Sequence, residues 1–300
     1  MTAEIIDGNA MAETIKTDLK TRVAALKAHG IVVRLAAVQV GEQPASRVYV
    51  NNQRKTCEEI GAEYRLDELP EGTAEPAFVA HVARLNADPA ITGIILQQPF
   101  PKGWDEKTIQ SMIAPAKDVE GMSPGNQGWV MYDRQDTPAP CTARAAVEIV
   151  KRSGAVLRGA DVCIIGRSEI VGKPAALMLI ALHATVSVLN SKTRDLAERC
   201  RRADILVVAA GRPNLVGADM IKPGALVVDV GINRVPVLGV DGQPVLNEKG
   251  KPKMKTVGDV DFEAVRAVAG KLTPVPGGVG PMTVAILLEN VVKAAELSRA

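Results

Sequence analysis

Short apolar runs alternate along this chain with longer stretches in which apolar positions recur every three or four residues. The runs that predict strands are 35–40, 64–66, 91–97, 162–165, 185–189, 205–209 and 226–230. The stretches that predict helices are 10–28, 46–60, 76–85, 106–113, 142–153 and 282–298. Strands that alternate with helices are typical of parallel sheets, so the pattern predicts an α/β fold.

An irregular segment, rich in Gly, Pro, Asn and Asp, separates two such series between residues 115 and 140. A length of 300 residues also favours two domains. We expect residues 1–141 and 282–300 to form an N-terminal α/β domain, and residues 142–281 to form a doubly wound, Rossmann-type dinucleotide-binding domain. The polar insert at 235–255 predicts a surface hairpin.

Composition narrows the class of protein. Lys and Arg total 36 against 34 Asp and Glu, a balance that argues against a nucleic-acid or membrane partner. The four cysteines show no CxxC spacing and the three histidines form no paired motif, so we expect no metal site and no disulfide framework. The N-terminus lacks the features of a signal peptide, which favours a cytoplasmic protein.

The run TPVPGGVGPMT, from Thr273 to Thr283, precedes the last predicted helix. Glycine permits close backbone approach and positive φ, and proline stiffens a loop, so this run is suited to touching a ligand. Pro274, Gly277 and Gly278 are therefore candidate ligand contacts. The alternative is a helix entry that touches no ligand.

A second glycine-rich turn follows the strand VCIIG, where Gly166 begins the run GRSEIVG and Gly172 ends it at the start of a helix. This is a variant of the dinucleotide fingerprint that lacks its central glycine, and a plain strand-to-helix turn remains the alternative. The candidate cofactor contacts in this turn are Gly166, Arg167, Ser168, Ile170 and Gly172.

The next strand ends in Asn-Ser-Lys-Thr-Arg, without the carboxylate that usually binds the ribose of NAD. Ser191, Lys192 and Arg194 can instead hydrogen-bond or pair with a 2′-phosphate, which favours NADP over NAD. A solvated loop with ordinary surface charge is the alternative. Further along, Asp229 ends a strand and either faces the cofactor or braces a turn.

In the first domain, Tyr49 and Gln53 lie four residues apart on one predicted helix and therefore share a face. Gln97 stands at the carboxyl end of a strand, where ligands bind in open α/β sheets. Asp118 and Glu120 add carboxylates that can accept hydrogen bonds from a ligand. Each residue alone is equally consistent with a helix cap or a solvated charge.

Taken together, these segments resemble the bifunctional methylenetetrahydrofolate dehydrogenase/methenyltetrahydrofolate cyclohydrolase family over almost the full length. The segments that carry the resemblance are PASRVYV, GIILQQPFP, KDVEG, PCT, GRSEIVGKP, DVGIN, VGDV and TPVPGGVGPMT. The resemblance implies a folate-binding first domain, a Rossmann second domain and a homodimer. It also implies catalytic roles for Tyr49 and Gln97, folate contacts at Ser46 and the 274–278 loop, and cofactor contacts near Ile232 and Thr283.

Two positions depart from the family pattern. The catalytic lysine of the YVxxK motif is Gln53 here, and Lys55 lies about 200° further around the helix. The aspartate of KDVDG is Glu120, one methylene longer. We therefore predict an NADP-dependent dehydrogenase with weak or absent hydrolysis of the methenyl product. The alternatives are a dehydrogenase for another pterin one-carbon carrier and a non-catalytic folate- and nucleotide-binding regulator.

Overall fold

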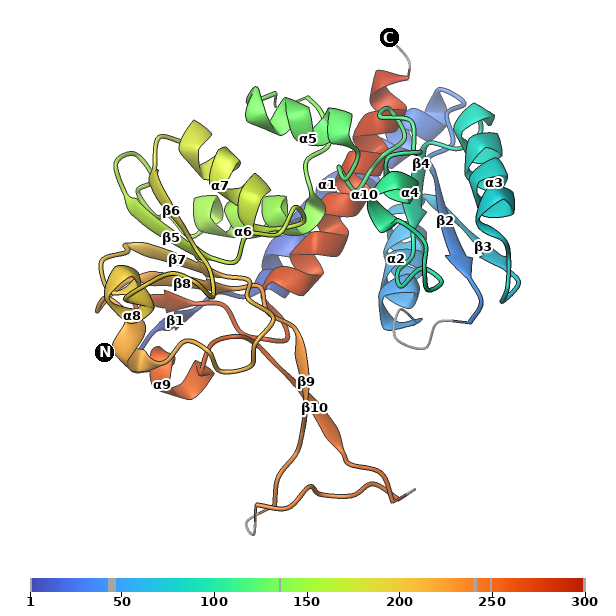
Figure 1. The fold of residues 1–300 in the computed structure, drawn as a ribbon. Helices are drawn as coiled ribbons and strands as arrows, with labels where there is room; N and C mark the ends of the chain where they lie inside the picture. Colours follow the sequence, from blue (N-terminus) through green and yellow to red (C-terminus); the bar gives the residue numbers. More distant parts are fainter. Residues whose placement is uncertain (1, 43–46, 135, 240–241, 249, 299–300) are drawn as a thin grey trace. The chain divides into compact units, whose positions relative to one another are not determined.

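The computed structural model describes residues 2–42, 47–134, 136–239, 242–248 and 250–298. The chain divides into two compact units, each with its own parallel sheet (Figure 1). Unit 1 comprises Met1–Asn9 and Thr142–Met282, and unit 2 comprises Ala10–Cys141 and Thr283–Ala300. The α/β architecture expected from the alternating pattern is confirmed.

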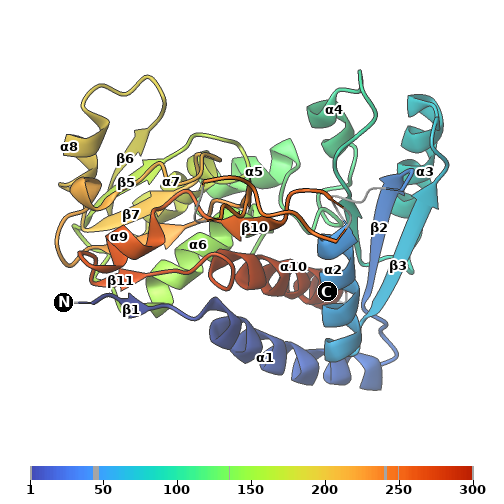
Figure 2. The same cartoon turned by 90° about the horizontal axis from the view of Figure 1, so that it is seen from below.

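The sheet of unit 2 has three parallel strands in the order β3-β2-β4. They are β2 (Arg34–Val40), β3 (Glu63–Leu69) and β4 (Gly93–Leu96). The helices are α1 (Gly8–Ala28), α2 (Arg47–Ile60), α3 (Glu75–Ala87), α4 (Glu106–Gln110), α5 (Pro124–Met131) and most of α10 (Val279–Leu297). Helices cover both faces of β2 (Figures 1 and 2). On one face, Val38 packs in a core cluster with Phe78 and Val82 of α3, which explains why this central strand is almost wholly apolar.

The sheet of unit 1 has six parallel strands in the order β1-β11-β8-β7-β5-β6. They are β1 (Glu4–Ile5), β5 (Asp161–Ile165), β6 (Thr185–Leu189), β7 (Ile205–Val208), β8 (Leu226–Asp229) and β11 (Lys271–Leu272). The helices are α6 (Cys141–Arg152), α7 (Gly172–Ala181), α8 (Leu196–Cys200), η1 (Ala218–Met220) and α9 (Phe262–Arg266). One core cluster joins alternate strand residues to α8, η1 and α9. The expected doubly wound sheet is present.

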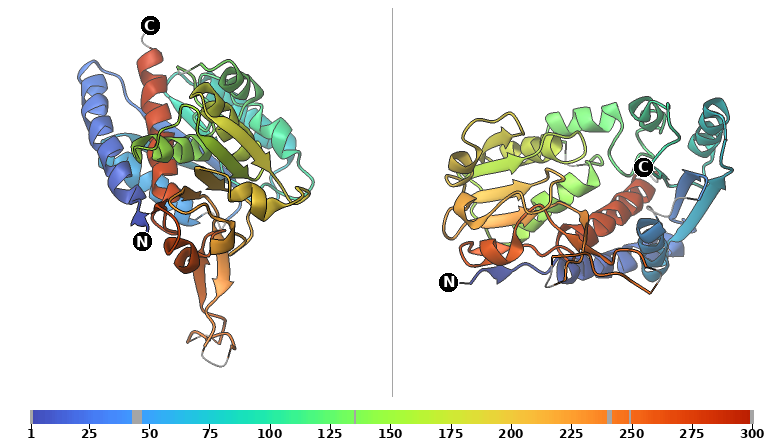
Figure 3. Two further views of the ribbon diagram at one scale, coloured as in Figure 1. Left: turned by 90° about the vertical axis from the view of Figure 1, so that its left-hand side faces the viewer. Right: turned by 60° about the horizontal axis from the view of Figure 1, so that its bottom comes forward.

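The predicted surface hairpin is confirmed. Strands β9 (Asn233–Pro236) and β10 (Met254–Val257) pair antiparallel, with Asn233 opposite Val257. Beyond them, the bridges Leu238 to Pro244 and Leu246 to Pro252 continue the ribbon. It projects from the sheet of unit 1 as a narrow arm (Figure 3).

The first nine residues differ from the expected domain assignment, which placed them with residues 10–141. Strand β1 pairs in parallel with β11 at the edge of the unit 1 sheet. Ala3 and Ile6 flank this pairing and are buried. This contact attaches the N-terminus to unit 1. It involves only two strand residues and two buried apolar side chains, a pattern too short for the sequence to indicate a strand.

A helix that the sequence did not predict lies in the segment expected to be irregular. Ser123 caps α5, since its Oγ accepts the N–H of Asn126 at 3.3 Å, and Pro124 occupies the first turn. Such a cap followed by proline is a helix start signal. The glycines at 125 and 128 obscured it because glycine disfavours helix. The last helix, α10, begins at Val279 rather than at residue 282.

Candidate active site

Helix α2 and strand β4 bring two buried amides together in unit 2. Gln53 has no exposed surface, and Gln97 is 3% exposed. The Gln53 Oε1 accepts hydrogen bonds from the Tyr64 hydroxyl at 3.1 Å and from the Gln97 Nε2 at 2.9 Å. Among the described residues, the Gln53 Nε2 has no partner in hydrogen-bonding geometry. Two of the three predicted catalytic side chains are therefore in direct contact.

Tyr49 lies one turn before Gln53 on α2 and is half-buried. Burial raises the pKa of its phenol well above the ordinary value, and Glu120 and Cys141 raise it further, while the neighbouring Gln53 amide opposes the rise. Tyr49 is therefore a neutral hydroxyl that can donate or accept a hydrogen bond. Because Gln53 acts on the pKa of its phenol, Tyr49 lies in the same cluster as the two amides.

Glu120 supplies a carboxyl to this cluster. It follows β4 by way of the loop whose residue Lys117 accepts the N–H of Ile94. Glu120 is half-buried, and within the described part of the chain its carboxyl has no hydrogen bond or ion pair. Burial, followed by the charge of Asp118, raises the pKa of Glu120 to about 8. The carboxyl is therefore poised to change protonation near neutral pH.

The Asp118 carboxylate is hydrogen-bonded within the protein, in contrast to the carboxyl of Glu120. Its oxygens accept the N–H of Met122 at 3.1 Å, the N–H of Ser123 at 2.6 Å and the Nδ2 of Asn126 at 3.0 Å. It is 1% exposed. The structure gives Asp118 the role of fixing the loop before α5, and the expected substrate contact stays a prediction.

Asn290 on α10 is a supporting residue that the sequence reading missed. It is 1% exposed, and its Nδ2 donates to the Val119 carbonyl at 2.8 Å. Cys141 adds a contact from its Sγ to the same carbonyl at 3.4 Å. Both hold the backbone between Asp118 and Glu120. The sequence signal for this residue is an amide within the otherwise largely apolar run VAILLENVV.

In unit 1, the turn after β5 needs both of its glycines. A Cβ at Gly166, where φ is +125°, would lie 2.2 Å from the Ala209 carbonyl oxygen. A Cβ at Gly172 would lie 2.1 Å from the Gly166 carbonyl oxygen. The backbone is therefore closely packed at Gly172, where the turn enters the helix. The turn leaves Arg167 and Ile170 exposed at the carboxyl edge of the sheet.

The turn after β6 presents the predicted phosphate-binding side chains to solvent. The Asn190 N–H donates to the Thr193 Oγ1 at 2.9 Å, and its Oδ1 accepts the Lys192 N–H at 2.9 Å. This turn leaves Ser191, Lys192 and Arg194 exposed. Since β6 neighbours β5, the two turns lie at the same edge of one sheet.

The structure decides between the two interpretations of Asp229. Its Oδ1 accepts the N–H groups of Gly231 and Asp259, and its Oδ2 accepts that of Val260, all within 3.0 Å. A Cβ at Gly258 would lie 1.8 Å from that Oδ2. Asp229 therefore braces the turn, and burial raises its pKa to about 6.

Asp259 is a second brace, which the sequence reading did not single out. Its oxygens accept the N–H groups of Ala210, Gly211 and Arg212 and the Nδ2 of Asn233, at 2.6 to 2.8 Å. The loops after β7 and β8 are thus tied together. The predicted cofactor contact Ile232 lies between these braces and is 69% exposed.

The loop from Pro274 to Gly278 is held within unit 1 by close backbone contacts. A Cβ at Gly278 would lie 2.6 Å from the Pro274 carbonyl oxygen, and one at Gly8 would lie 1.9 Å from the Gly278 carbonyl oxygen. Gly277 has a φ of +106°. Packing alone therefore accounts for these glycines, and folate contact stays a prediction. Thr283 belongs to unit 2, and Ser46 lies outside the described residues.

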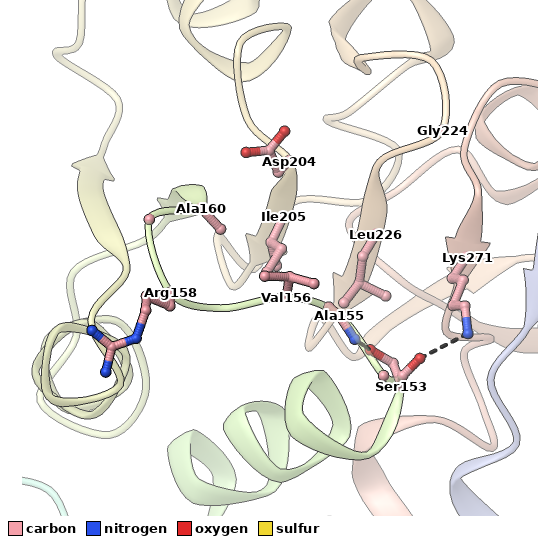
Figure 4. Close-up of a pocket in the computed structure, with 12 residues that line it drawn as sticks. Ser153, Ala155, Val156, Arg158, Ala160, Asp204, Ile205, Gly224, Leu226 and Lys271 are labelled. Atoms are coloured by element: carbon pink, nitrogen blue, oxygen red, sulfur yellow. Dashed lines mark hydrogen bonds between the residues drawn. The ribbon is translucent and has the colours of Figure 1, made fainter.

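A hollow of about 470 Å³ opens at the opposite edge of the unit 1 sheet (Figure 4). Its wall includes the residues at which β7, β8 and β11 begin, Ile205, Leu226 and Lys271. Lys271 donates to the Ser153 carbonyl at 2.7 Å. Dinucleotides bind at the carboxyl ends of such strands, so this hollow is distinct from the predicted cofactor site.

Comparison with known proteins decides the family. The model of the tetrahydrofolate dehydrogenase/cyclohydrolase catalytic domain matches residues 6–120, and that of the NAD(P)-binding domain of the same enzymes matches residues 140–299. The chain belongs to the tetrahydrofolate dehydrogenase/cyclohydrolase family. The catalytic-domain match contains Tyr49, Gln53 and Gln97, and the NAD(P)-binding match contains the Gly166 turn.

Members of the family align with the chain from end to end. The bifunctional protein FolD of Bordetella avium is 47% identical over 99% of this chain and 98% of its own. The FolD of Moorella thermoacetica is 46% identical over 98% and 99%. The structure of the Campylobacter jejuni enzyme, 42% identical, superposes with a TM-score of 0.90 over 99% of both chains. That of the Trypanosoma brucei enzyme, solved with NADP and an inhibitor, also has a TM-score of 0.90, at 36% identity over 100% and 99%.

Two features are absent from the described residues. These residues contain no group of three His, Cys, Asp or Glu side chains arranged to hold a metal ion. No helix that the structure describes is long and apolar enough to cross a membrane.

Proposed function

We propose that the chain oxidises 5,10-methylenetetrahydrofolate to the 5,10-methenyl form with NADP, and hydrolyses the product only weakly. The observation that carries this proposal is Gln53, a buried amide at the position of the catalytic lysine of the family. Its oxygen is held by Tyr64 and Gln97, so the amide is a fixed part of the site. Membership in the family supports both the substrate class and the dehydrogenase activity.

The residues of unit 1 fit NADP. Gly166 and Gly172 leave no room for side chains at the turn where a dinucleotide phosphate approaches the helix. Ser191, Lys192 and Arg194 are exposed hydrogen-bond donors at the neighbouring turn, suited to a 2′-phosphate. When bound, NADP accepts the hydride. The Trypanosoma brucei relative was solved with this cofactor.

Dehydrogenation makes few demands on the protein. The hydride leaves a carbon that lies between two nitrogen atoms, and their lone pairs stabilise the resulting cation. The site must chiefly orient the substrate, which the neutral groups of Tyr49, Gln53 and Gln97 can do through hydrogen bonds. We therefore expect dehydrogenation to survive the loss of the lysine.

Hydrolysis makes greater demands, because a proton leaves water and another reaches a ring nitrogen. An amide does not titrate, and the loss of general acid/base help typically lowers a rate by about 10² to 10⁴. Lys55 is exposed, and Gln53 is buried on the same helix, so this lysine does not face the amide cluster. We expect hydrolysis to be slow relative to dehydrogenation.

The test is the Gln53→Lys variant, assayed for both reactions. The Tyr64 oxygen and a reoriented Gln97 amide can accept hydrogen bonds from the new ammonium group, so we expect hydrolysis to rise at least tenfold. The matched control is Lys55→Gln, which makes the reverse exchange at an exposed position and should change neither rate. Native hydrolysis as fast as dehydrogenation would contradict the proposal.

Family membership also supports a homodimer, which we propose for this chain. Sedimentation equilibrium of the purified protein should give twice the 31.7 kDa mass of one chain. A monomer at micromolar concentration would contradict it.

A further inference from the structure

Glu120 is a half-buried carboxyl without a partner in the described part of the protein. It has no hydrogen bond or ion pair there, which leaves it available to water or to a ligand. The same carboxyl is close enough to Tyr49 to raise the pKa of the phenol. Its backbone is fixed, because its carbonyl accepts the Cys141 N–H at 3.3 Å and the preceding carbonyl is held by Asn290.

The phenols and amides of the cluster cannot exchange protons near neutral pH. Burial raises the pKa of Tyr49 and of Tyr64, so both phenols stay protonated. Gln53 and Gln97 are amides. The Asp118 carboxylate already accepts three hydrogen bonds, from its own loop and from α5. Glu120 is left as the side chain with a titratable, unpaired group.

We propose that Glu120 carries the proton transfers of the remaining hydrolysis, in place of the absent lysine. This inference rests on the proposed function, because it concerns the second reaction of the same site. It also explains the two departures from the family pattern together. The lysine is replaced by a group without a proton to transfer, and the aspartate by a carboxyl that reaches about one methylene further.

The step balances without a co-reactant. The Glu120 carboxylate takes a proton from water as the water oxygen bonds to the methenyl carbon, which neutralises the cation. The carboxyl then gives that proton to the ring nitrogen N5 as the bond between carbon and N5 breaks. The hydroxyl proton leaves to solvent as the carbonyl forms, and the formyl group remains on N10. One water is consumed and one proton is released, with no change in oxidation state.

The groups that face Glu120 fix the direction of its pH dependence. They are Tyr49 from α2, Asp118 from its own loop and, next to Tyr49, Cys141 at the start of α6. No cationic side chain of the described residues contributes to its pKa, which burial and Asp118 raise to about 8. The attacking step needs the carboxylate, so kcat/KM for hydrolysis should rise with pH and level off above about 8. The substrate cation favours the carboxylate, so kcat should level off at lower pH.

The experiment compares Glu120→Gln with the native enzyme, with both reactions measured and the spontaneous hydrolysis subtracted. Glutamine keeps the length of the side chain and removes its proton chemistry. We expect the ratio of hydrolysis kcat to dehydrogenase kcat to fall at least tenfold, with loss of the pH dependence near 8. An unchanged ratio with an unchanged pH profile would overturn the proposal. So would native hydrolysis no faster than the spontaneous reaction.

A second background separates proton transfer from substrate binding. In Gln53→Lys, the new ammonium can transfer the proton, so adding Glu120→Gln should lower the ratio less than threefold. An equal loss in both backgrounds would show that Glu120 acts by binding substrate, and would overturn the proposal. Failure of the proposed function looks different, because the native enzyme would then show no reduction of NADP with methylenetetrahydrofolate.

Discussion

The half-buried carboxyl of Glu120 should make the stability of the chain depend on pH, and Glu120→Gln should remove that dependence. Burial raises its pKa from 4.5 to about 8 in the folded state. Between these values the folded chain holds a proton that the unfolded chain releases. The stabilising contribution is therefore complete below pH 4.5 and is lost as the pH rises to about 8.

The magnitude follows from the two pKa values. A difference between 4.5 and about 8 corresponds to at most about 5 kcal/mol in the free energy of unfolding. The slope is about 1.4 kcal/mol per pH unit, so the native protein should lose about 2 to 3 kcal/mol between roughly pH 5.5 and 7.5 relative to Glu120→Gln. Partial exposure of the carboxyl lowers this figure.

Urea unfolding followed by tryptophan fluorescence measures the effect. Trp104 and Trp129 are the two tryptophans of the chain, and both belong to unit 2, as does Glu120. The matched control is Glu68→Gln, which removes an exposed carboxyl from β3 and should follow the native pH dependence. If native, Glu120→Gln and Glu68→Gln lose stability in parallel, the carboxyl is solvated and the reasoning fails.

Three further predictions concern other parts of the molecule. Gly172→Ala places a Cβ 2.1 Å from a carbonyl oxygen, so it should lower the melting temperature and raise KM for NADP more than tenfold. The control is Gly128→Ala, which has open space around the new Cβ and should change neither quantity. Lys192→Ala should raise KM for NADP about tenfold and leave that for NAD unchanged, since only NADP has the 2′-phosphate; equal effects would exclude this contact. Asp259→Ala leaves four donors without their acceptor, and should lower the free energy of unfolding by about 3 to 5 kcal/mol in thermal or urea denaturation.

Much of the fold follows from periodicity. The buried strands β2 and β5 are almost wholly apolar, as is typical of strands covered on both faces, and their ends were predicted within one residue. The tight packing at Gly172 was also predictable, since the residue stands where a strand turns directly into a helix. These features depend on neighbours in sequence.

Features that depend on distant partners were not predictable. Asp118 and Glu120 stand two residues apart and have similar side chains, yet the Asp118 carboxylate accepts three hydrogen bonds and the Glu120 carboxyl has none among the described residues. Asp229 receives N–H groups from a segment 30 residues later. Asn290 reaches a carbonyl 171 positions away. Only the folded structure brings these partners together.

The products that the native enzyme forms over time show whether hydrolysis keeps pace with dehydrogenation. Purified native protein is mixed with methylenetetrahydrofolate and NADP, and reduced cofactor, methenyl product and formyl product are quantified over the same time course. We expect reduced NADP and the methenyl product to rise together and the methenyl product then to persist. Rapid conversion to the formyl product, in step with the reduction of NADP, would contradict it.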